Sequence, residues 1–151
     1  MQLPIVALIA FQAQVVSPEH TLVEDQLIAE ANQVRESHGL GPLRVHSALT
    51  SAARWHAKDM ADGDYLNHRD REGRMPWDRA VHFAYPQYRV IRENLAQTYD
   101  LQANVPVKLW LESKGHRENL LAKDVDEVGV GIRRGEGRKI FWAMVLARRS
   151  R

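Results

Sequence analysis

The chain has 151 residues, of which 44% are hydrophobic and 26% charged, and its 21 lysines and arginines nearly balance 19 acidic residues. This composition is that of a globular protein, and the length suits one domain with a single core. The near balance of interspersed charges argues against intrinsic disorder and a nucleic-acid partner, and the absence of cysteine excludes disulfides, thiolate metal sites and a cysteine nucleophile.

The first sixteen residues are apolar and contain no lysine or arginine. This stretch is shorter than the ~20 apolar residues that cross a bilayer as a helix, so no transmembrane segment is expected. We interpret residues 1–16 as a signal peptide or N-terminal extension, with Ala10 or Ala13 before a cleavage point, and residues 17–151 as the domain. The missing positive charge leaves two alternatives, an ordered N-terminal strand or helix and a boundary introduced by cloning.

Two amphipathic helices are predicted in the first half of the domain. The first begins near Ser17 or at Thr21 and ends at Gly39, which suits the left-handed position after a helix. A short packed turn at residues 40–45 follows, and the second helix begins at Ser47, with Gly63 beyond its end. Its inward face carries small and apolar residues together with one histidine, namely Leu49, Ala53, His56, Ala57 and Met60. The alanines predict close packing against a sheet.

The middle of the chain is less regular. Residues 67–74 are polar and aperiodic, which is typical of a loop. Pro76 opens a short helix, residues 88–95 predict a strand, and a further helix begins near Asn104. That helix carries Val107, Trp110 and Leu111 inward.

Two strands at residues 128–133 and 139–146, joined as a hairpin, complete the chain. Gly129 and Gly131 alternate along the first of these strands. This pattern indicates either that another backbone lies close to the strand or that side chains are absent beneath the floor of a cleft. The order of helices and strands predicts an α+β layered domain. The terminal residues 147–151 are locally basic, and we prefer a solvated tail there over a lipid or nucleic-acid contact.

Three motifs resemble the signature of the CAP superfamily, which contains the cysteine-rich secretory, antigen-five and pathogenesis-related proteins. They are Asn67-His68, Arg92-Glu93-Asn94, and the stretch from Trp110 to Leu121 that runs on into residues 127–131. The likeness is to the short, cysteine-free bacterial members and covers about residues 20–148. It implies a three-layer α-β-α sandwich with a central antiparallel sheet, and a secreted or cell-envelope-associated protein, which we expect to be a monomer.

The resemblance also implies that His68, Glu93, Ser113 and His116 meet in one open cleft. His68 and His116 are the expected ligands of zinc or another divalent metal, bound weakly because two imidazoles make an incomplete site. Glu93 would hydrogen-bond one imidazole and fix its tautomer. Ser113 stands where many relatives have a second glutamate, and Glu112, one residue earlier, is expected to point away. Taken alone, the two histidines have no diagnostic metal spacing.

The other histidines have simpler interpretations. His20, His38 and His46 lie at predicted helix ends or turns, where exposure or capping explains them. His56 is expected to be a core residue with its hydrogen bond satisfied, and His82 has no assigned role. Asn94 is expected to use its amide on neighbouring backbone.

Two classes of function stay open. The first is a binding module for a divalent metal, for a small ligand such as a lipid, sterol or cell-wall fragment, or for both. The second is a metal-dependent hydrolase in which a metal on His68 and His116 activates water and Glu93 is the base. Glu93 cannot easily serve as both ligand and base, so we favour binding and do not expect an enzyme. A Ser113–His116 nucleophile pair lacks an identifiable oxyanion hole.

Overall fold

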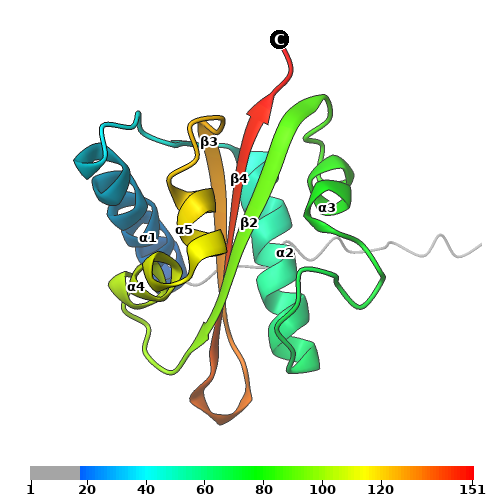
Figure 1. Cartoon of the computed structure of the whole chain (residues 1–151). Coiled ribbons are helices and arrows are strands. Elements are labelled where there is room, and N and C mark those ends of the chain that lie inside the picture. Colours follow the sequence, from blue (N-terminus) through cyan, green and yellow to red (C-terminus); the bar gives the residue numbers. More distant parts are fainter. Residues whose placement is uncertain (1–17) are drawn as a thin grey trace, which may run out of the picture.

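The computed structural model describes residues 18–151, so the expected leader at residues 1–16 lies outside the described residues. Within this part of the chain, α-helices cover both faces of a four-stranded sheet, as Figure 1 shows. The helices α1, α4 and α5 lie on one face, and α2 and α3 lie on the other. The predicted three-layer α-β-α sandwich is therefore confirmed.

The sheet has the strand order β1-β3-β4-β2, with bounds Arg44–Val45 for β1, Glu127–Arg134 for β3, Ile140–Arg149 for β4 and Tyr88–Thr98 for β2. The three long strands β3, β4 and β2 pair antiparallel with one another. The two-residue β1, in the segment predicted as a packed turn, pairs parallel to β3. In β4, every residue from 140 to 147 is buried, because helices cover both of its faces. Since β4 extends to Arg149, most of the basic end is sheet and not the solvated tail that was predicted.

The four predicted helices form as α1 Pro18–Ser37, α2 Ser47–Gly63, α3 Pro76–His82 and α4 Asn104–Glu112. A further helix, α5 Lys114–Leu120, was not predicted. Gly39 is left-handed after α1, with φ of 70°, as expected. At the end of α2, Gly63 is instead the last helical residue, and Asp64 takes the left-handed conformation with φ of 49°. A 3-10 turn at Glu136–Arg138 joins β3 to β4. None of the helices in the described part is long and apolar enough to cross a membrane.

Two glycines let α2 lie directly on the sheet. A Cβ added at Gly129 would lie 2.0 Å from the carbonyl carbon of Leu49, and one at Gly131 would lie 2.4 Å from that of Ala53. Both neighbours are helix backbone and cannot move without shifting α2. The predicted close approach of another backbone is confirmed, and it brings α2 against β3 and β4.

Gly129→Ala is expected to lower the free energy of unfolding by about 1–3 kcal/mol or more, because the added methyl group must push α2 off the sheet. Gly115→Ala is the control, because a Cβ at Gly115 meets nothing within 4 Å and this glycine lies within a helix. That change should be neutral or stabilise by up to about 1 kcal/mol. Urea denaturation of the two variants measures the difference, and equal unfolding midpoints would contradict the close contact.

Candidate functional site

The predicted site residues come from four separate elements. His68 lies in the loop between α2 and α3, Glu93 in the middle of β2, Ser113 at the junction of α4 and α5, and His116 in the first turn of α5. The structure joins His68 to Glu93 directly, because Nδ1 of His68 lies 2.8 Å from Oε1 of Glu93. The imidazole is 46% exposed, whereas the carboxylate is 1% exposed. A buried carboxylate thus holds a histidine that faces solvent.

The hydrogen bond to Glu93 determines the tautomer of His68. An ionised carboxylate can only accept hydrogen bonds, so Nδ1 of His68 must carry a proton and donate it. In the neutral ring, Nε2 is then unprotonated and offers its lone pair. This is the arrangement in which an outer carboxylate orients a metal-binding histidine.

Arg79 holds both partners of this pair and was missed by the sequence analysis. Its side chain is 1% exposed, and Nη2 lies 2.8 Å from Oε2 of Glu93. Nη1 donates to the carbonyl oxygens of His68 and Arg74, each at 2.9 Å. The guanidinium therefore neutralises Glu93 and also fixes the backbone of the loop that carries His68. An arginine on a short helix is usually solvated, so its residue type gave no signal of this role.

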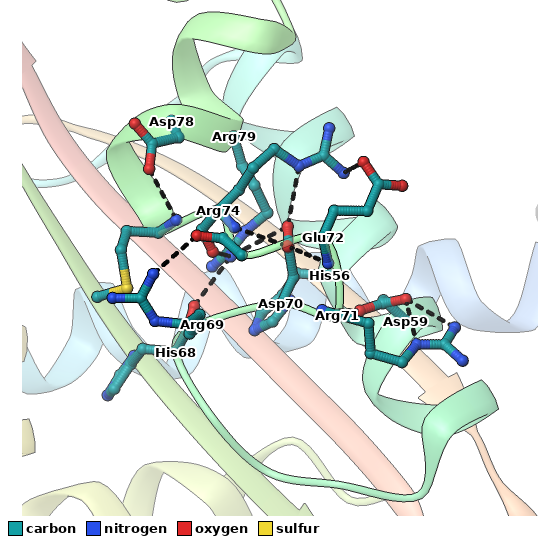
Figure 2. A network of polar contacts seen from close by, with 12 residues as sticks. His56, Asp59, His68, Arg69, Asp70, Arg71, Glu72, Arg74, Asp78 and Arg79 are labelled. Carbon is teal, nitrogen blue, oxygen red and sulfur yellow. Dashed lines mark hydrogen bonds and ion pairs between the residues drawn. The ribbon is translucent and has the colours of Figure 1, made fainter.

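Asp70 organises the rest of the loop, as the network in Figure 2 shows. Its Oδ1 accepts from the backbone N–H groups of Glu72 and Arg74 at 2.9 and 2.8 Å, and its Oδ2 lies 3.0 Å from Nε of Arg74. Burial alone would raise the pKa of Asp70. The hydrogen bonds from Arg74 and the charges of Arg74 and Arg79 outweigh burial and lower this pKa. The loop that presents His68 is therefore tied down by charged groups on both sides.

His116 is positioned through its backbone. Its carbonyl oxygen accepts a hydrogen bond of 2.9 Å from Nδ2 of Asn94, which neighbours Glu93 on β2. Asn119 completes this connection, because its Nδ2 donates to the Glu93 carbonyl and to Oδ1 of Asn94. The expected structural role of Asn94 is confirmed, whereas Asn119 was missed. One strand thus anchors His68 by a side chain and His116 by an amide network.

The surroundings of His116 favour the neutral form of its ring. Burial lowers its pKa first, and the charge of His68 lowers it further. A neutral imidazole is the form that binds a metal.

Ser113 marks an unexpected break in the chain. The predicted helix from Asn104 stops at Glu112, and Ser113 takes an extended conformation with φ of −102° and ψ of 124° before α5 begins. Ser113 is half-buried, and within residues 18–151 its hydroxyl caps neither helix. Glu112 is exposed, in agreement with the expectation that it points away. The break turns α5 so that His116 can approach β2.

The donor set limits what metal this site can hold. Among the described residues, no group of three histidine, aspartate or glutamate side chains is arranged to hold a metal ion. Glu93 is buried and its two oxygens already have partners in His68 and Arg79. A metal here would have two imidazoles from the protein and its remaining positions open.

The other histidines largely follow their structural interpretations. His56 is buried on α2, and its Nε2 lies 2.8 Å from the carbonyl oxygen of Asn67. The expected hydrogen bonding is thus met at Nε2 only, because the buried Nδ1 has no hydrogen-bond partner among the described residues. Burial is the main cause that lowers its pKa. His46 caps α2 by accepting from the N–H of Ala48 at 3.2 Å. His38 and His82 are exposed, and the side chain of His20 lies outside the described residues.

A model of the cysteine-rich secretory protein family, CAP, matches residues 28–146. The uncharacterised protein YkwD of Bacillus subtilis is 32% identical over 108 residues, which cover 72% of this chain and 41% of YkwD. The match to the B. subtilis membrane protein YlbC covers 32% of YlbC. The chain therefore spans less than half the length of these curated relatives.

Two of the solved structures with the same fold are a bacterial extracellular protein and a bacterial outer surface protein. An extracellular protein of Bacillus anthracis with an SCP domain superposes with a TM-score of 0.78 and 24% identity, over 89% of this chain and 44% of that one. An outer surface protein of Borrelia burgdorferi gives a TM-score of 0.77 and 22% identity, over 90% of this chain and 97% of that one. At these identities the likeness shows the fold.

Proposed function

The chain belongs to the cysteine-rich secretory protein (CAP) family, and on that basis we propose that it binds a divalent metal ion through His68 and His116. The observation that carries this proposal is the hydrogen bond from Nδ1 of His68 to the buried Glu93, which leaves Nε2 free for a metal. The lowered pKa of His116 adds a second neutral imidazole. Imidazole nitrogens suit zinc and other borderline divalent ions.

Weak, reversible binding is expected because two protein ligands are fewer than the three usual at a catalytic zinc. A structure of NaASP2 with Zn²⁺ shares the fold with a TM-score of 0.62 at 12% identity, over 89% of this chain and 82% of that one. It supports zinc as the first ion to test. The coordination positions of the metal that the two imidazoles leave open would accept oxygen atoms of a small ligand. The polar groups around His68 favour a cell-wall fragment over a lipid or sterol.

Binding is a better proposal than hydrolysis because of how Glu93 is placed. A general base must reach the proton that it removes. Glu93 is 1% exposed, and Arg79 and His68 occupy its two oxygens, so water bound to a metal on His68 has no free oxygen of Glu93 to reach. We propose that this carboxylate orients His68. The bacterial surface and extracellular relatives support a secreted or cell-envelope location, which we also propose.

Zinc titration of protein without a histidine tag should show binding that His68→Ala combined with His116→Ala weakens at least tenfold. The matched control is His38→Ala with His82→Ala, which removes two exposed histidines outside the site. Affinity should fall as the pH drops below the ~6.5 of free imidazole, because protons then compete for the ring nitrogens. The lowered pKa of His116 shifts its own protonation to lower pH.

Calorimetry at pH about 7.5, 6.5 and 5.5 measures this dependence on both sides of the imidazole pKa. The thermal midpoint of the site variant should stay close to that of the parent, because His68 is largely exposed and neither ring belongs to the core. Equal zinc affinity in the parent and the site variant would place the metal elsewhere. Zinc-dependent hydrolysis of peptides, esters or glycans that Glu93→Gln abolishes would establish the hydrolase instead.

A further inference from the structure

A polar hollow of about 580 Å³ lies at one end of the sheet, and neither His68 nor His116 lines it. It forms where β1, β2 and β3 begin and β4 ends, near the C-terminal end of the chain in Figure 1. Its walls carry five arginines, Arg44, Arg89, Arg148, Arg149 and Arg151. The metal-binding proposal does not use any of these residues.

The two acidic residues of the hollow pair with only some of the arginines. Nη2 of Arg149 lies 2.8 Å from Oε1 of Glu127, and Nε of Arg148 lies 3.4 Å from Oδ2 of Asp126. Arg44 approaches that same carboxylate at 3.9 Å.

Positive charge is therefore in excess in the hollow. The side chains of Arg89 and Arg151 make no hydrogen bond or ion pair with any residue in the described part of the chain. With five arginines and two carboxylates in its lining, the hollow has three more positive than negative side chains. This excess of positive charge favours the approach of an anion.

The strand pairing brings like charges together. In the β2–β4 ladder, Tyr88 pairs with Arg149 and Val90 with Arg148, and the register shift between Tyr88 and Val90 leaves Arg89 outside the ladder. Such irregularities redirect a side chain at the edge of a sheet. Here Arg89 joins two arginines of the neighbouring strand, although like charges across strands are destabilising. The charge of Arg148 even contributes, after burial, to the lowered pKa of Arg35. Ion pairs account for Arg44, Arg148 and Arg149, whereas no contact with the described residues accounts for Arg89 and Arg151.

We propose that this arginine hollow binds a phosphate group, either of a free phosphate compound or of a lipid headgroup. Guanidinium groups match phosphate oxygens in paired hydrogen bonds, and the hydroxyl of Ser150 in the same lining can add another. The described lining residues include no aromatic side chain on which a nucleic-acid base could stack, and no aliphatic one to hold an acyl chain. The ligand class is therefore a small polar phosphate, and not a nucleic acid or a lipid tail.

The test compares the full chain with Arg89→Gln combined with Arg151→Gln. These two side chains have no partner in the described structure, so the variant breaks no ion pair there and should keep its thermal midpoint. The matched control is Lys108→Gln with Arg138→Gln, which removes two exposed charges away from the hollow. Titration with inorganic phosphate should show at least a fivefold loss of affinity in the hollow variant and less than a twofold change in the control. Equal losses in both variants, or no phosphate binding by the parent, would overturn the proposal.

Two further arms identify the source of the phosphate. If the hollow binds a lipid headgroup, vesicles of phosphatidylglycerol in phosphatidylcholine should compete with inorganic phosphate. If it binds a free phosphate compound, a soluble phosphate ester should compete and the vesicles should not. Either result supports a phosphate site. Backbone amide shifts of the parent on adding phosphate should be largest at Glu127 and Ser150, and shifts centred elsewhere would refute the assignment. Duplex DNA that binds more tightly than phosphate and depends on Arg89 would show a nucleic-acid surface instead.

Discussion

Replacing Arg79 by methionine is expected to lower the free energy of unfolding by about 3–5 kcal/mol, because removal of one partner leaves a buried charge uncompensated. Glu93 is 1% exposed and would lose the guanidinium 2.8 Å away. The carbonyl oxygens of His68 and Arg74 would lose their donor as well. Since the same contacts place the His68 loop, zinc affinity should fall together with stability.

Urea denaturation of Arg79→Met beside Arg69→Met measures this effect. Arg69 lies in the same loop but is exposed, and its side chain donates to the carbonyl oxygen of Gly73 at 2.9 Å. The Arg69 variant should stay within about 0.5 kcal/mol of the parent. A loss below about 1 kcal/mol for Arg79→Met would mean that Glu93 finds another partner or a proton, and the role assigned to the buried pair would be wrong.

Trp110→Ala is expected to cost on the order of 3–5 kcal/mol of unfolding free energy, as truncation of a buried aromatic side chain does. Trp110 is 1% exposed in the core between the sheet and the α1, α4 and α5 layer. Its indole N–H donates to the carbonyl oxygen of Leu95 at 2.9 Å, so the variant also leaves a buried acceptor without its partner.

Trp77→Ala provides the comparison, because Trp77 on α3 is 43% exposed. This variant should lower the free energy of unfolding by only a fraction of the loss in Trp110→Ala. Trp110→Phe separates packing from hydrogen bonding, since it keeps most of the ring and removes the donor. Chemical denaturation of the three variants should give the order Trp110→Ala, Trp110→Phe, Trp77→Ala from largest to smallest loss. Similar losses for Trp77→Ala and Trp110→Ala would contradict the assigned core.

Much of the fold could be predicted because its local signals are strong. Pro76 opens α3, Gly39 takes the left-handed position after α1, and Gly129 with Gly131 marks the strand that α2 touches. The break at Ser113 was missed, although Gly115 lowers the helical propensity of this segment and serine favours the position before a helix. Its extended conformation depends on how α4 and α5 pack on β2.

The candidate site, like the fold, could be predicted only in part from the sequence. The family resemblance implied that Glu93 contacts one of the two imidazoles without indicating which, and the structure shows that this one is His68. Arg79 and Asn119 were missed, since an arginine on a short helix and an asparagine near a helix end usually face water. Their contacts form only when folding brings β2 beside the His68 loop and beside α5. No local sequence pattern predicts that placement.

Nitrogen NMR of the imidazole rings, with and without zinc, tests most directly whether Glu93 holds His68 ready for a metal. In its neutral form, the ring of His68 should carry its single proton on Nδ1, which donates to Glu93. Zinc should then shift Nε2 of His68 together with one ring nitrogen of His116, and leave His38 and His82 unchanged. A proton on Nε2 of His68, or zinc that shifts neither ring of the pair, would contradict the proposed metal site.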